Sequence, residues 1–312
     1  MQTHCFNDFD AFTESIGDLK SRMLLRNVTR HQWSINSVDL DGFKVQYGRL
    51  GSGNIAQAEV SSLAYMLYLP LTDSVEYRAN GTVLEEDSFA ILEPGCEVCV
   101  STKDAHDWLV VSIPSQRFDC DALSGSFPAS RDHNVWVTGA MHQAARKYRH
   151  LLRETMIAAA NNPQFESSPA AACVAAELLK IASSVIGNQQ ASLPVRGRPP
   201  ISREAIIACS RELIEQRDGQ VVAVEDLAAA ASVSERTLRN AFNEYFGAGP
   251  ARYLRLRQLH QVKRALEVGD PDEISVSDVL LRYGVWEFGR FASRYRRIFG
   301  VLPSETLRAT FR

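Results

Sequence analysis

Two short stretches near the carboxyl end carry arginine, asparagine and hydroxyl side chains at helical spacing. In the first stretch these are Ser234, Arg236, Thr237, Arg239, Asn240 and Asn243. In the second they are Arg290, Ser293, Arg294, Arg296 and Arg297. Arginine forms paired hydrogen bonds with guanine and asparagine with adenine, whereas threonine, asparagine and further arginines suit phosphate oxygens. The residue types therefore favour contact with double-stranded DNA.

The two stretches belong to a near-repeat. Residues 227–247 and 279–300 each contain a short apolar segment, a tight turn and a longer segment that ends at a glycine. The second copy has one extra residue after the turn. This order predicts a helix-turn-helix unit in each copy. The helix between them, at residues 251–266, is expected to act as a rigid spacer that sets both units in successive major grooves, about 34 Å apart. Leu256, Leu259 and Leu266 are expected on its inner face, and Lys263 on its outward side or rim.

The spacing of apolar residues indicates which face of the longer helix in each unit is buried. Leu238 and Phe242 are four residues apart, as are Phe291 and Tyr295, so each pair lies on one helical face. Ser234 is expected to cap the helix of the first unit. The arginine, asparagine and hydroxyl side chains of the two stretches are then expected on the opposite, outward face of each helix.

The charge distribution agrees with this interpretation. The chain has 312 residues, which suggests about two domains, and a formal net charge of −3. Residues 245–266 contain five basic side chains and no acid, and residues 288–304 contain four arginines and no acid. A charge run is most often a solvated face, but its position on matched helical units favours DNA.

The amino-terminal part has a different pattern. Residues 40–115 contain short β-rich runs separated by turn signals, among them Asn80-Gly81, which is typical of a hairpin. Residues 139–160 and 170–187 have the apolar stripe of helices. We therefore expect an α+β chain, with a small β-barrel or sandwich and following helices, then an all-α domain of two helix-turn-helix units.

These patterns divide the chain into four parts. We expect a strand-rich amino-terminal domain at 1–137, a helical segment at 138–187, a linker at 188–200 and a DNA-binding domain at 201–312. The linker has no apolar period, three prolines and two arginines.

The carboxyl-terminal part resembles the AraC/XylS family of bacterial transcription regulators. The resemblance rests on "VEDLAAAASVSERTLRNAFNEYFG", "GPARYLRLRQLHQVKRAL" and "ISVSDVLLRYGVWEFGRFASRYRRIFGVLPSETLR". It implies a cupin-like barrel that binds a small effector, helices that form a homodimer, promoter DNA and RNA polymerase as partners, and activation of a catabolic or metabolic operon. Residues 285–307 are particularly similar to the branch of the ethanolamine-utilisation regulators.

The resemblance also assigns base contacts. They fall on Arg236, Arg239 and Asn240 in the first unit, and on Gly289, Arg290, Ser293 and Arg294 in the second. Here the chain departs from the family pattern: Val285 replaces the common Phe after the turn glycine, and Gly289 and Ser293 are small. We therefore expect more base contacts from the first unit and mainly phosphate contacts from the second.

Tyr65, Tyr68 and Trp108 are candidates for an effector pocket, although for any single one of them ordinary core packing is the favoured explanation. Cys96 and Cys99 do not indicate zinc, because a zinc site needs four ligands. The histidines are dispersed, so no metal or other cofactor is expected. The alternative function is a cupin-like binding protein or enzyme whose carboxyl-terminal helices serve oligomerisation.

No apolar run reaches the ~18 residues that a membrane span needs, and the amino-terminal residues are acidic where a signal peptide is basic. The sequence therefore predicts a cytoplasmic protein that acts without a membrane.

Overall fold

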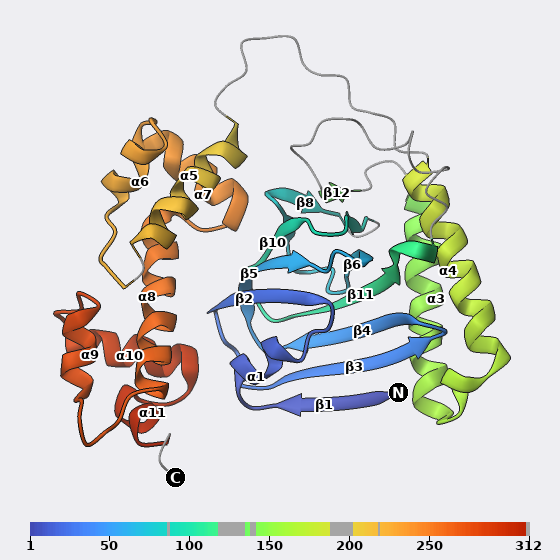
Figure 1. Cartoon of the computed structure of the whole chain (residues 1–312), viewed down its shortest axis with the longest axis horizontal. Coiled ribbons are helices and arrows are strands. Elements are labelled where there is room, and N and C mark those ends of the chain that lie inside the picture. Colours follow the sequence, from blue (N-terminus) through green and yellow to red (C-terminus); the bar gives the residue numbers. More distant parts are fainter. Residues whose placement is uncertain (86–87, 118–134, 138–141, 188–201, 218, 310–312) are drawn as a thin grey trace.

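The computed structural model describes residues 1–85, 88–117, 135–137, 142–187, 202–217 and 219–309. Four layers follow one another in Figure 1: two long helices, a large sheet, a smaller sheet and a group of short helices. The predicted linker at 188–200 lies outside the described residues, so the linker stays a prediction.

The strands form two antiparallel sheets. The larger one runs in the order β1 (Gln2–Phe6), β3 (Trp33–Leu40), β4 (Phe43–Leu50), β11 (His106–Pro114), β6 (Ala64–Pro70), β9 (Ala90–Leu92) and β12 (Val135–Val137). The smaller one runs in the order β2 (Leu19–Arg26), β5 (Gly53–Val60), β10 (Glu97–Thr102), β7 (Tyr77–Ala79) and β8 (Thr82–Leu84). The predicted Asn80-Gly81 hairpin joins β7 to β8, with positive φ angles of 46° and 83°. The strands thus form a sandwich of two sheets, and the expected closed barrel is not confirmed.

Both faces of the larger sheet are apolar, and alternate side chains of its strands pack in different cores. On β6, Met66 and Tyr68 face the smaller sheet, whereas Leu67 and Leu69 face the long helices. Because successive side chains of a strand point to opposite faces, one apolar run fills two cores. This explains why β6 and β11 are buried along almost their whole length.

Two helices cover the outer face of the larger sheet. They are α3 (His142–Asn161) and α4 (Pro169–Gly187), joined by the short helix η2 (Phe165–Ser167). Tyr148, Leu152 and Leu178 are fully buried between the helices and the sheet. The predicted helices at 139–160 and 170–187 are confirmed within a few residues at their ends.

Seven short helices make up the carboxyl-terminal part. They are α5 (Arg203–Gln216), α6 (Val224–Ala230), α7 (Glu235–Phe246), α8 (Pro250–Glu267), α9 (Val276–Arg282), α10 (Phe288–Phe299) and α11 (Pro303–Ala309). Two remaining short helices, α1 (Phe9–Glu14) and η1 (Ser115–Arg117), lie in the amino-terminal part. None of the described helices is long and apolar enough to cross a membrane.

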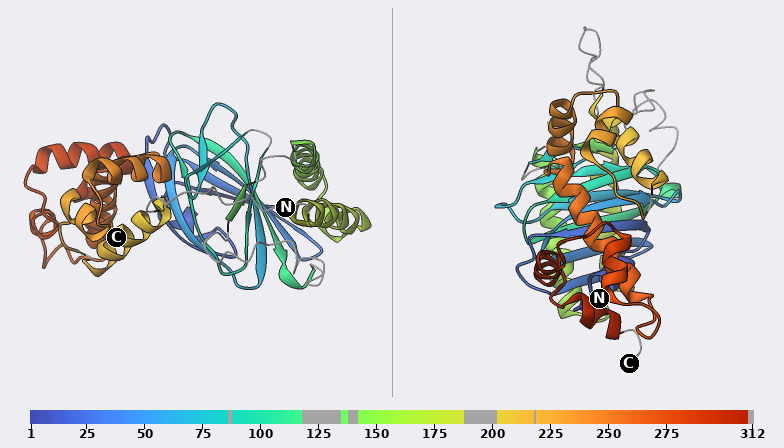
Figure 2. Two further views of the ribbon diagram at one scale, coloured as in Figure 1. Left: turned by 90° about the horizontal axis from the view of Figure 1, so that it is seen from above. Right: turned by 90° about the vertical axis from the view of Figure 1, so that its left-hand side faces the viewer.

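The carboxyl-terminal helices pack on the outer face of the smaller sheet. Figure 2 shows α8 running across this sheet, on the side opposite α3 and α4. Leu24, Ile55 and Cys99 from the sheet join the apolar core of α5, α6 and α7. A second shared core joins α8 and α10 to the interior of the sandwich. The sheet therefore holds both helix-turn-helix units against one surface.

Phe242 tests the packing of the first unit. Its side chain is 1% exposed and contacts the rings of Phe246 and Tyr253, with ring centroids 5.3 and 5.6 Å away. Phe242→Ala should lower the free energy of unfolding by about 3–5 kcal/mol, because it leaves a cavity. Phe288→Ala removes the same side chain from a half-exposed site and should cost less than about 1 kcal/mol. Urea titration measures both, and equal losses would contradict the packing.

Candidate nucleic-acid interface

The first helix-turn-helix unit consists of α6 and α7. Ser232 takes a left-handed conformation in the turn, with φ of 52°. Ser234 is the N-cap of α7, and its hydroxyl accepts a hydrogen bond from the Thr237 amide at 3.2 Å. Ser234 Oγ also lies 2.9 Å from Thr237 Oγ1. The predicted capping role of Ser234 is confirmed, and it orients the start of the helix that carries the first set of candidate DNA contacts.

The second unit consists of α9 and α10. Gly284, with φ of 70°, takes the place in the turn that Ser232 has in the first unit. Five residues separate α9 from α10, whereas four separate α6 from α7, which confirms the predicted extra residue. Glu287 precedes α10 and accepts a hydrogen bond from Arg290 at 2.8 Å. A Cβ built on Gly289 would meet no atom within 4 Å, so this surface is open.

The two longer helices bury one face and expose the other, as predicted. Leu238, Phe242, Phe291 and Tyr295 are all buried. The side chains that the sequence assigned to DNA are all exposed, namely Ser234, Arg236, Thr237, Arg239, Asn240, Asn243, Arg290, Ser293, Arg294, Arg296 and Arg297. Neither sheet covers any of these side chains.

Helix α8 connects the two units. It has 18 residues, which gives a length of about 27 Å. α7 lies near its first turn and α10 near its last turns (Figure 1). Leu256, Leu259 and Leu266 are buried along α8, which confirms its predicted inner face. This length is of the same order as the distance between successive major grooves, about 34 Å.

Arg26 at the end of β2 joins the sheet to the first unit. Its guanidinium donates to the carbonyl oxygens of Phe246 and Gly247, at 2.9 and 3.0 Å. These carbonyls end α7, where a cation satisfies free acceptors and the negative end of the helix dipole. Burial and the neighbouring Arg252 lower the pKa of Arg26 to about 10. The arginine remains charged at neutral pH and fixes the end of α7 against the sheet.

His260 joins the sheet to α8. Its Nε2 accepts a hydrogen bond from the backbone amide of Leu25 at 2.8 Å. β2 is an edge strand, so this amide has no partner within its sheet, and the imidazole satisfies it. Burial, together with the charges of Arg264 and Lys263, lowers the pKa of His260 to about 3. The neutral imidazole is the form that accepts this bond.

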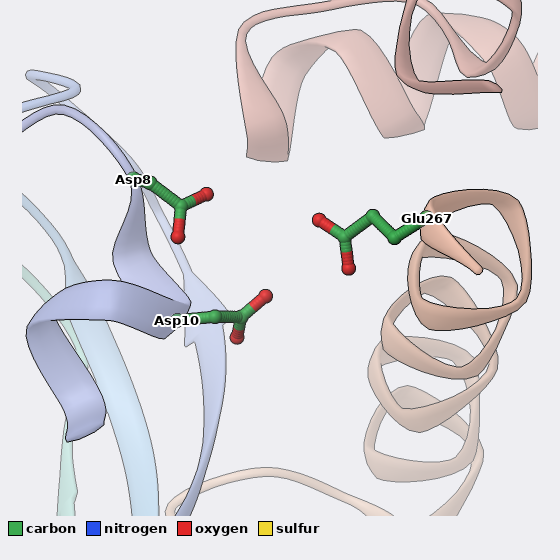
Figure 3. Close-up of side chains that lie close together, drawn as sticks. All are labelled: Asp8, Asp10 and Glu267. Carbon is green, nitrogen blue, oxygen red and sulfur yellow. The ribbon is translucent and has the colours of Figure 1, made fainter. Parts of the chain in front are cut away.

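Lys263 makes a third contact between the two parts. Its Nζ pairs with Asp10 and Glu267, and lies 3.6 Å from Asp8. Figure 3 shows the three carboxylates pointing toward one another, two from the region of α1 and one from α8. They lie close enough to hold a cation, but the lysine ammonium already supplies the positive charge. Burial alone would lower the pKa of Lys263, but the hydrogen bonds to Asp10 and Glu267 raise it above its ordinary value.

The predicted effector residues separate into two groups. Tyr68 and Trp108 line a small cavity of about 50 Å³ between the sheets, with ring centroids 6.3 Å apart. Tyr65 lies three residues from Tyr68, so it points to the other face of β6 and packs in the core beneath α3 and α4. Asn54 and His106 add polar groups to the cavity. Burial lowers the pKa of His106 to about 4, so its imidazole is neutral at pH 7.

Comparison with known proteins supports the interpretation of the helices. A family described as "Helix-turn-helix domain" matches residues 227–309, which include both units. The chain is 34% identical over 134 residues to "XylDLEGF operon transcriptional activator 2" of Pseudomonas putida, and covers 80% of that protein. The chain belongs to the AraC/XylS family. The match covers 43% of this chain.

Matches to other relatives cover a smaller share of their length. The chain is 33% identical over 138 residues to "XylDLEGF operon transcriptional activator" of Pseudomonas putida, which is 44% of this chain and 40% of that protein. The chain thus spans about two fifths of the length of several curated relatives that it matches. Among solved structures, the AraC-like transcriptional activator CuxR aligns over 85% of this chain, with 12% identity and a TM-score of 0.44.

The sequence did not reveal the residues that join the two parts of this AraC/XylS-family chain. Arg26 and His260 meet partners more than 200 positions away along the chain. Lys263 was expected on the outward side of α8, but it is 7% exposed. No local pattern marks such contacts, although a basic residue within an apolar strand end, as in "MLLRN", is a weak signal.

His260 makes the stability of the docked structure depend on pH. An unfolded histidine has a pKa of about 6.5, well above that of His260 in the folded chain. The stabilisation is complete above about pH 6.5 and is lost as pH falls toward 3, because the unfolded state then binds the extra proton. At pH 5 the loss is about 2 kcal/mol.

His260→Gln keeps a hydrogen-bond acceptor but does not titrate. Its free energy of unfolding, measured in urea from about pH 7 to 5, should fall less steeply than that of the wild type. Parallel curves for the two proteins would show that His260 does not carry this dependence.

Proposed function

We propose that this protein is a sequence-specific DNA-binding transcription regulator that responds to a small effector and activates a metabolic operon. The observation that carries the proposal is the pair of exposed, arginine-bearing helices α7 and α10, mounted on one spacer helix. The family match over both units and the activator names of the Pseudomonas putida relatives support it.

The two units differ in what they offer to DNA. α7 exposes Arg236, Arg239 and Asn240, whose side chains suit base edges in the major groove. α10 exposes mainly arginines, with the small Gly289 and Ser293 between them. Ser293 Oγ donates to the Gly289 carbonyl at 3.0 Å, so its proton is committed to the helix. We propose that α7 carries most of the sequence specificity and that α10 contacts mainly phosphates.

Arg239→Ala should weaken binding to the preferred site by about 1–3 kcal/mol and relax the sequence preference at one base pair. Selection of preferred duplexes from a random pool, followed by fluorescence anisotropy, measures both effects. Unchanged affinity and preference would contradict the assignment of α7.

Arg297→Ala removes an exposed arginine from α10, for comparison with Arg239→Ala on α7. It should weaken all duplexes by similar factors and lower the slope of log affinity against log salt by about 1. Loss of preference at a single base pair in this variant would show that α10 also contacts bases.

We further propose that the sandwich is a cupin-like effector domain whose ligand enters the cavity at Tyr68 and Trp108. None of the described residues that line this cavity is charged at pH 7, since His106 is neutral, so the proposed ligand is uncharged and largely apolar where it is buried. Tyr65 is excluded from this proposed site, because it lies on the far face of β6.

Ala56 lines the same cavity, and Ala56→Leu would fill it. In a thermal-shift screen with small uncharged metabolites, a compound that raises the Tm of the wild type should not raise that of this variant. The free energy of unfolding of the variant should be about 1–3 kcal/mol lower than that of the wild type, because the larger side chain overpacks the core. An equal rise in Tm for both proteins would place the ligand elsewhere.

Helices α3 and α4 are the proposed dimerisation segment, and RNA polymerase is the proposed partner of the bound protein. Both proposals rest on the family. We propose that the similarity to the ethanolamine-utilisation branch reflects common ancestry. It does not identify the effector.

A further inference from the structure

A cationic cleft lies where the sheet, α8 and α10 meet. It has a volume of about 610 Å³. Its polar lining consists of Arg26, Asn27, Arg252, Arg255, Arg294 and Arg297. None of the described residues that line it is acidic. Among the residues that the structure describes, none of these arginines forms an ion pair with a carboxylate.

Arg26 has no ion-pair partner in the described part of the chain, although the charge of Asp104 raises its pKa by less than burial and Arg252 lower it. Its side chain is 1% exposed, and its Nε has no hydrogen-bond partner. Arg252 is close enough to lower the pKa of Arg26, after the larger effect of burial. Buried charges are ordinarily paired, since an unpaired donor in the interior costs free energy. An anion in the cleft would meet the four exposed arginines Arg252, Arg255, Arg294 and Arg297, with the charge of Arg26 behind them.

The position of the cleft indicates which anion it meets. A duplex that presents successive major grooves to α7 and α10 must carry its backbone along α8. Arg252 and Arg255 lie in the first two turns of α8, and Arg294 and Arg297 on α10 line the same cleft. Arginine forks match phosphate oxygens, and several such contacts in a row suit a phosphodiester backbone.

We propose that this cleft binds phosphate groups, and that in the DNA complex these are backbone phosphates between the two major grooves. This inference rests on the proposed function and extends it, because Asn27 and Arg26 come from the amino-terminal part. Asn27 accepts a hydrogen bond from Arg252 at 2.9 Å, so it also positions an arginine of the spacer helix. The amino-terminal part thereby contributes to the DNA interface as well as to effector binding.

Arg252→Ala and Arg255→Ala in the full chain test the cleft. A mixed-sequence duplex of about four helical turns serves as the probe, with salt varied from about 50 to 200 mM. Each variant should lose roughly three- to tenfold in affinity for all sequences, and about 0.9 in the salt slope. Arg117→Ala, which removes an exposed arginine of η1 in the amino-terminal part, is the matched control and should bind as the wild type does.

Asn27→Asp tests the contribution of the amino-terminal part. It adds a carboxylate to the cleft and should weaken duplex binding at least as much as loss of one arginine. Asn27→Gly is its control, because both variants lose the hydrogen bonds that the Asn27 amide donates to Lys103 and Asp104, but only aspartate adds charge. Glycine accepts the φ of 47° at this position. Circular dichroism and Tm identify any variant that fails to fold.

Inorganic phosphate is the probe that tests whether the cleft binds phosphates of the DNA backbone or a free phosphate compound. If it raises the Tm of the wild type but not of Arg255→Ala, while duplex binding is equal in both, the cleft holds a free phosphate compound. If the cleft variants and Asn27→Asp match the wild type in both assays, the inference is wrong, although loss of specificity in Arg239→Ala would still support the proposed function. A wild type that bound no duplex would overturn the proposed function and the duplex as occupant together.

Discussion

The packing of α7 and α10 against α8 is the constraint on which the rest depends. Phe242 and Phe246 from α7 stack around Tyr253, and Tyr295 from α10 contacts Phe299, which packs against His260. These contacts decide which side of each helix is buried, and therefore which side chains meet solvent. Since both helices pack on the same rigid spacer, their exposed faces keep a fixed separation, which DNA with its regular pitch can match.

A second level of constraint comes from the smaller sheet. Its edge strand β2 meets the spacer helix through His260, and the end of α7 through Arg26. On the other side of the same sheet lies the cavity with Tyr68 and Trp108. A ligand that changes the position of β2 therefore acts on both recognition helices through a single strand. Such coupling requires a difference in free energy between two arrangements of the chain, which the ligand can then bias.

The sequence predicted the local features well and the long-range ones poorly. The Ser234 cap, the turn at Gly284 and the buried faces with Leu238 and Phe291 are set by neighbouring residues, so helical spacing and turn chemistry reveal them. The closed barrel was not confirmed, because the way strands distribute between two sheets depends on pairings far apart in sequence. Lys263 seemed an outward lysine for the same reason: its carboxylate partners Asp8 and Asp10 lie about 250 residues away.

The spacing of contacts on bound DNA tests the central claim most directly. Hydroxyl-radical footprinting and guanine-methylation interference on a selected duplex locate the backbone and major-groove contacts at single-base resolution. Two recognition helices on one spacer predict two contacted major grooves on the same face of the duplex, with centres about 10 base pairs apart. A single contacted groove, or two groups of contacts on opposite faces separated by about half a turn, would contradict the account.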